Sequence, residues 1–182
     1  TQINIALWTK QLGDLQKLYG ATLMAKLDQK GALEIAIAQA KAINPERPQR
    51  QQAQTLISHW SKEIQRLEDR PFLERAQQLA DSGDKASLEL AIAEARKIEQ
   101  GRALRIDAQT DIARWTKQIQ VLEDQPLYSE ALDLASKGKL RDAITAARKI
   151  EKGRALYTQA QNSIKAWTTR IQVAEDRPIL DE

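Results

Sequence analysis

The segment IARWTKQIQVLEDQP (112–126) recurs as IKAWTTRIQVAEDRP (164–178), with 9 of 15 positions identical. A second pair of segments, AIAEARKIEQGRAL (91–104) and AITAARKIEKGRAL (143–156), lies at the same separation and shares 11 of 14 positions. Self-similarity at a fixed period is the signature of a repeat architecture. The 182-residue sequence is therefore a repeat rather than one irregular domain.

Tryptophans and glycines set the register of the copies. The four tryptophans recur at intervals of 52, 55 and 52, and a glycine follows each of the first three at one constant interval: Trp8, Trp60, Trp115, Trp167, with Gly31, Gly83 and Gly138. We expect the three additional residues of the second copy to lie in a loop within 84–87. The predicted units are 1–46, 47–101, 102–153 and a partial unit 154–182, which together form a single helical-repeat domain. Because this register places the first residue inside a helix, we expect the sequence to be a fragment of a longer protein.

Apolar spacing predicts three helices in each unit. The first runs from about Arg102 to Glu123 in one copy, with apolar residues separated by 4, 3, 4 and 3 positions: Ala108, Ile112, Trp115, Ile119 and Leu122. Proline fits the first turn of a helix but not its interior, so a second helix is expected to start at Pro71, Pro126 or Pro178. That helix should end at Gly83 or Gly138, and a third at Gly101 or Gly153. In the first copy we expect a looser junction at 19–20 and a rigid corner at 45–48.

These elements predict an all-α fold, an α-solenoid in which each unit is stabilised by stacking on its neighbours. The long helices should line one side and the short hairpins the other. A right-handed superhelix is expected by analogy alone.

The segment YSEALDLASKGKLRDAITAARKI (128–150) resembles a tetratricopeptide helical hairpin. The matching features are Ala131, Leu134, Ala135, Gly138, Leu140, Ala143, Ile144 and Ala147. The resemblance covers about half of each unit, and an interposed Trp-bearing helix lengthens the period from 34 residues to about 52. The full unit is also similar to helical repeats of large cyanobacterial proteins labelled chromosome-segregation ATPase-like. The tetratricopeptide resemblance implies a protein-interaction scaffold.

Paired acidic residues recur just before each proline, as Glu68–Asp69, Glu123–Asp124 and Glu175–Asp176. Such pairs could bind a cation or act in acid–base chemistry. Topology favours a structural role, because each hairpin returns the chain to the acidic corner where the next long helix starts. We therefore predict ion pairs of Arg102 with Glu68 or Asp69, and of Arg154 with Glu123 or Asp124.

The aromatic and histidine side chains are also interpreted as structural. Trp8, Trp60, Trp115 and Trp167 could be exposed stacking platforms, but their place in the apolar stripe predicts burial in the core. His59 is the only histidine and lies off that stripe, so we expect it on the surface.

Composition excludes several classes of function. The chain has no Cys and one His, which excludes a disulfide framework and disfavours metal sites and nucleophilic catalysis. No apolar run is long enough to span a membrane, and a cytoplasmic location is expected. Lys and Arg number 28 against 25 Asp and Glu, and acids intervene among the basic corners, so nucleic-acid binding is disfavoured.

We accordingly expect no catalytic residue, cofactor or metal. The leading hypothesis is a non-catalytic scaffold that binds a protein or peptide, with binding residues left unknown. The alternatives are a self-associating structural or filament-forming array, and a weak nucleic-acid-binding module.

Overall fold

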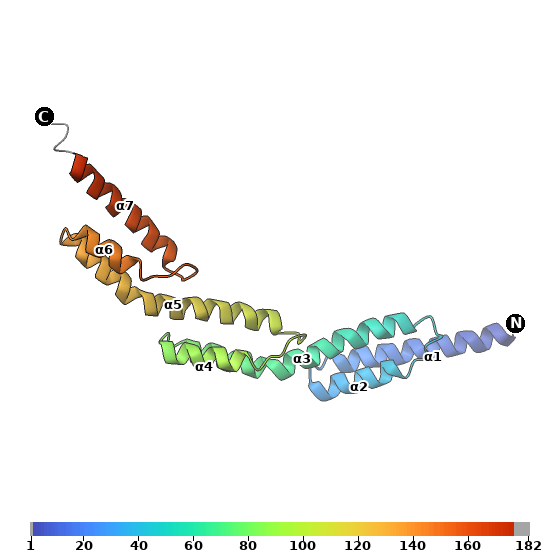
Figure 1. Cartoon of the computed structure of the whole chain (residues 1–182). Coiled ribbons are helices and arrows are strands. Elements are labelled where there is room, and N and C mark those ends of the chain that lie inside the picture. Colours follow the sequence, from blue (N-terminus) through green and yellow to red (C-terminus); the bar gives the residue numbers. More distant parts are fainter. Residues whose placement is uncertain (1, 177–182) are drawn as a thin grey trace. The chain divides into compact units, whose positions relative to one another are not determined.

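The computed structural model describes residues 2–176, which form seven α-helices and no strand (Figure 1). The predicted all-α class is confirmed. Contacts group the described residues into two compact units, one formed by residues up to 74 together with 96–108, the other by 75–95 together with those from 109 onward. The helices are α1 (Gln2–Ala25), α2 (Lys30–Lys41), α3 (Arg50–Ala80), α4 (Lys85–Ala95), α5 (Arg105–Ser136), α6 (Leu140–Ala147) and α7 (Tyr157–Asp176).

The long helices do not break at their prolines. Pro71 lies inside α3 and Pro126 inside α5, so the prediction that a new helix starts at each of them is wrong; Pro178 lies outside the described residues. An interior proline costs about 3 kcal/mol in a helix. Buried side chains on both sides, Trp115 before Pro126 and Tyr128 after it, offset that cost. α5 changes direction along its length (Figure 1), as a helix with an interior proline is expected to do.

Each of the first three copies therefore has one long and one short helix instead of three helices. The expected looser junction at 19–20 is also wrong, because α1 continues through both residues. The corner at 45–48 has the same succession of turns as the corners at 100–103 and 152–155.

The contacts of the first copy recur in the second at residue numbers that are higher by 55. Arg50 Nη1 donates to the carbonyl of Ile43 and Arg105 Nη1 to that of Ile98. The buried residues follow the same spacing, in the pairs Ala21 and Ala76, Leu33 and Leu88, Ala40 and Ala95, Ala53 and Ala108, and Trp60 and Trp115. The structural period between these two copies is thus 55 throughout.

This spacing corrects the register expected for the first copy. Residue 28, not Gly31, matches Gly83: Asp28 has φ of 49° and Gly83 of 70°, whereas Gly31 lies within α2. The difference of three residues arises in the third copy, where Leu140 follows Gly138 by two positions while Leu88 follows Gly83 by five. The residues expected in a loop at 84–87 form the start of α4 from Lys85 onward, so that expectation is wrong.

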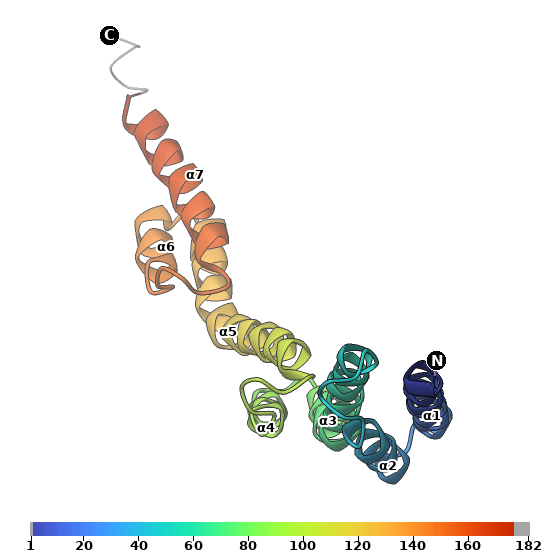
Figure 2. The same cartoon turned by 90° about the vertical axis from the view of Figure 1, so that its right-hand side faces the viewer.

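Each unit has its own apolar core. In the first, α1 packs against α2 (Figures 1 and 2), and Trp60 joins a cluster of Leu18, Ala21, Leu33, Ala36, Ala40, Ile43 and Ala53. In the second, α6 packs against α7, and Trp167 joins Tyr128, Ala131, Ala135, Ala143, Ile144, Ala147, Ile150 and Ala160. Both cores combine alanines, which let helices approach closely, with larger aliphatic side chains and one buried tryptophan. No helix in the described part of the chain is both long and apolar enough to cross a lipid bilayer.

Candidate functional site

The predicted arginine corner is present in the first unit. Arg102 follows the turn after α4, and its Nη2 lies 2.6 Å from Asp69 Oδ1 and 3.0 Å from Glu68 Oε2. Its Nε donates to Asp69 Oδ2 at 2.9 Å. Lys30 Nζ approaches Glu68 Oε1 at 2.6 Å, so each carboxylate has a basic partner.

The second unit repeats this cluster. Arg154 donates from Nε to Asp124 Oδ2 at 2.9 Å and from Nη2 to Glu123 Oε2 at 2.9 Å. Lys85 Nζ lies 2.6 Å from Glu123 Oε1. Hydrogen bonding to Lys85 first, and to Arg154 next, lowers the pKa of Glu123, and the bond to Glu123 raises the pKa of Lys85.

These clusters fit a structural role. Asp69 is 4 % exposed and Asp124 is 3 % exposed, and the guanidinium group occupies both oxygens of each carboxylate. A carboxylate whose lone pairs already accept two charge-assisted bonds is poorly placed to bind a metal ion or to accept a proton from a substrate. The arrangement ties the start of each following segment to the middle of the preceding long helix.

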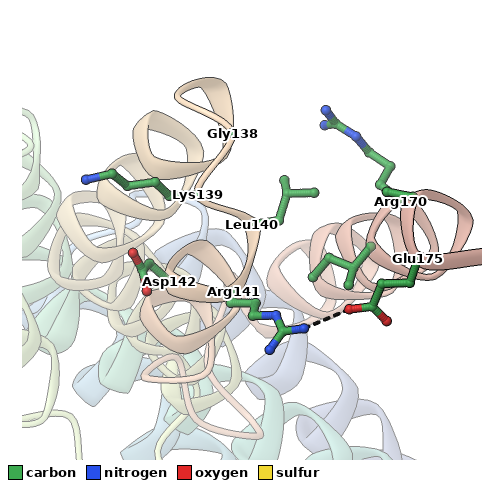
Figure 3. A pocket seen from close by; sticks show the side chains of 9 residues that line it. Gly138, Lys139, Leu140, Arg141, Asp142, Arg170 and Glu175 are labelled. Carbon is green, nitrogen blue, oxygen red and sulfur yellow. Dashed lines mark hydrogen bonds and ion pairs between the residues drawn. The ribbon is translucent and has the colours of Figure 1, made fainter. Parts of the chain in front are cut away.

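The first and last copies depart from this pattern. Arg47 takes the place of Arg102, and its Nε lies 3.8 Å from Asp14 Oδ2, with Arg47 Nη1 and Asp14 Oδ2 buried and without a hydrogen bond. In the last copy Glu175 binds Arg141 of α6 at 2.7 Å (Figure 3), and Asp176 is exposed, unlike its buried counterparts.

The tryptophans do not all lie in the core. Trp60, Trp115 and Trp167 are buried as expected, but Trp8 is 68 % exposed, so its predicted burial is wrong. When the first copy is aligned by its contacts, Trp8 matches Glu63 rather than Trp60. Ile5, which does match Trp60, is 62 % exposed as well, so the described residues leave this whole face of α1 open.

A shallow groove of about 470 Å³ lies between the start of α6 and the end of α7 (Figure 3). Its apolar lining comes from Leu140, Ile171 and Ala174, and Ala174 stands where the earlier copies carry Leu67 and Leu122. The Arg141–Glu175 ion pair bridges the two helices at its rim. The groove offers a small apolar floor, and part of its charged rim is already paired within the chain.

A larger apolar surface lies on α1. We call it the α1 stripe; it comprises the exposed residues Ile5, Trp8, Leu12, Leu15 and Tyr19. Their alternating separations of three and four positions place them on one helix face. Sequence reasoning interpreted Trp8 as a core residue and so missed the stripe. In the 55-residue register, three of its residues, Trp8, Leu15 and Tyr19, match polar positions of the other copies.

Basic side chains are distributed among acidic partners. Lys30, Lys85, Arg102 and Arg154 bind the corner carboxylates, and Lys97 Nζ lies 5.7 Å from the centre of the Phe72 ring. His59 is exposed, as expected.

Scans of the chain against protein-family models, curated proteins and solved structures find no match.

Proposed function

We propose that the chain is a non-catalytic scaffold that binds another polypeptide through its helical surface. The observation that carries this proposal is the α1 stripe, in which one face of a long helix exposes five large apolar side chains in succession. Scattered exposed apolar residues are normal in proteins, but contiguous ones mark interaction sites. The resemblance of 128–150 to tetratricopeptide hairpins supports the same function.

Nucleic-acid binding receives less support. Such a function needs basic residues that outnumber acids along one face, whereas Lys30, Lys85, Arg102 and Arg154 are engaged by carboxylates.

Site-specific photo-crosslinking in the cells that express the protein tests the proposal. A photoreactive p-benzoylphenylalanine in place of Tyr19 should give a covalent adduct with another polypeptide. The same group in place of Ser129 is the matched control, because Ser129 is exposed on α5 at the position equivalent to Tyr19 two repeats later.

The adduct should disappear when Leu15→Glu is added, since a charge within the stripe would have to be desolvated on binding. Adducts of equal yield from both positions, or none from Tyr19, would contradict the proposed function.

A further inference from the structure

Three of the five residues of the α1 stripe are not explained by the repeat, whereas Ile5 and Leu12 occupy the positions of Trp60 and Leu67 in α3. At the 55-residue spacing, Trp8, Leu15 and Tyr19 correspond to Glu63, Arg70 and Glu74 of α3 and to Gln118, Gln125 and Ser129 of α5. Five of these six counterparts are exposed and the sixth, Glu63, is half-buried. Three positions that carry polar side chains in both later copies are therefore large and apolar in α1 alone.

The spacing of the stripe specifies the geometry of what covers it. Residues 5, 8, 12 and 15 occupy the a and d positions of two successive heptads and residue 19 the a position of a third, the pattern by which one helix packs along another. At about 1.5 Å per residue the stripe extends roughly 21 Å. An extended peptide or a compact loop would not match this period, whereas a second helix with the same period would.

The residues that flank the stripe point to the chemistry of that helix. Positions next to a and d, which select partners through charge, are occupied by Thr9, Gln11 and Gln16 on the open sides. Asp14 is buried and faces Arg47 within its own unit. The face therefore carries no charge that would repel its own copy or require an opposite charge, so it meets the electrostatic requirement of a two-fold symmetric interface.

We propose that the α1 stripe pairs with the α1 stripe of a second copy of this chain, so that two copies associate through a two-helix interface. This inference rests on the proposed function and names the partner of the same surface. Trp8 and Tyr19 would each bury a large ring, and because these side chains have few rotatable bonds they would lose little conformational entropy on burial.

The exposed area is sufficient for a weak, specific dimer. Aromatic side chains such as Trp8 and Tyr19 can bury on the order of 150–250 Å² each, and the five residues of the stripe are between 47 % and 69 % exposed. Pairing two stripes would bury roughly 1000 Å² in total, close to the lower limit for a specific interface. We therefore expect a dissociation constant on the order of 1–100 µM.

Sedimentation velocity of the purified chain across a concentration series tests the pairing. The wild type should change from monomer to dimer with rising concentration, and Leu15→Glu should remain monomeric. Leu132→Glu is the matched control, because Leu132 is 45 % exposed on α5 and Leu15 is 47 % exposed on α1. The control variant should dimerise as the wild type does, and circular dichroism should show unchanged helix content in both.

Trp8 provides a second readout. As the one exposed tryptophan among the four, its emission should shift to shorter wavelength with concentration, and Trp8→Phe should abolish that shift. A wild-type chain that stays monomeric up to about 1 mM would overturn the pairing, because this concentration exceeds the expected dissociation constant. So would a dimer that Leu15→Glu leaves intact. A heterologous adduct at Tyr19 in cells, together with a monomeric purified chain, would overturn the pairing and leave the proposed function standing.

Discussion

Asp124 is almost completely buried, and a single guanidinium compensates its charge. Arg154 binds both of its oxygens and also reaches the backbone carbonyl of Gln120. A buried carboxylate that loses its partner keeps its desolvation cost without the compensating bonds. The ion pairs made by the corner arginines should therefore contribute more to the free energy of unfolding than the exposed ion pairs do.

Arg154→Met should lower the free energy of unfolding by about 2–3 kcal/mol, less than for a fully buried pair because the Arg154 side chain is 27 % exposed. Arg141→Met is the control, since it removes the exposed pair with Glu175 and should cost less than about 0.5 kcal/mol. Urea unfolding monitored by circular dichroism measures both. Equal losses in the two variants would contradict the assignment of Arg154 to a structural tie.

The acidic corner also predicts a pH dependence. The folded state lowers the pKa of Glu123 below its ordinary value of 4.5, so its contribution to stability is present above that value and is lost as the pH falls through the lowered pKa. Glu123→Gln should therefore be less stable than the wild type at pH 7, and the difference should shrink below about pH 4.5. Thermal melts of both chains over pH 2.5–7 measure this difference in stability. A difference that did not change with pH would show that it does not arise from ionisation of Glu123.

The corner pairs could be predicted from the sequence, because topology alone returns Arg102 to Asp69 and Arg154 to Asp124. The environment of Trp8 could not. Trp8 and Gly31 have the same residue types and spacing as the later tryptophans and glycines, but they do not occupy the same positions in the structure. The structure reveals the 55-residue register through the positive φ of Asp28 and through contacts such as those of Arg47 and Arg50.

The helices themselves were predictable in type and not in extent. Apolar periodicity identifies them, but proline was interpreted as a boundary at Pro71 and Pro126. Local propensity opposes a helix at both residues, and burial of the side chains on either side outweighs it. Whether burial outweighs the cost of the proline cannot be predicted from the local sequence, because it depends on what the two halves of the helix pack against.

Pro126→Ala should stabilise the chain by about 1–2 kcal/mol. The substitution restores a helical hydrogen bond and removes the clash of the ring with the preceding turn, at a smaller cost in unfolded-chain entropy. Pro126 is exposed, so no packing is lost. Chemical denaturation measures the change. A loss of stability would mean that the bend of α5 is required by the packing of α6 and α7.

A pair of glycine substitutions tests the corrected register. Gly31 lies in α2 with open space around it, so Gly31→Ala should stabilise by about 0.5 kcal/mol. Gly138 has φ of 77°, so Gly138→Ala should destabilise by about 1 kcal/mol despite similar open space. If both substitutions lowered the melting temperature, the assignment of the helix-terminating position to Asp28 would be wrong.

Each of the two units contains an apolar cluster of its own, so we expect the helices of that cluster to open as a local group. Nearest-neighbour packing is typical of repeat proteins, and Trp167 belongs to the cluster of the second unit alone.

Trp167→Ala should cost the second unit about 3–5 kcal/mol. Hydrogen exchange should then be faster for amides of α6 and α7, with the protection of α1 and α2 unchanged. Equal loss of protection throughout would show that the whole chain opens as one cooperative body.

The two units also interlace along the chain, since each is built from non-adjacent segments. A protease that nicks the exposed residues at 99–101 would leave 75–95 on one piece and 109–176 on the other, joined by contacts such as the 3.0 Å bond from Gln77 to Asp111. It would likewise leave Arg102 on the second piece and Asp69 on the first, still bound to each other. A nicked chain is thus expected to persist as a complementing pair of fragments, each holding a part that the other needs.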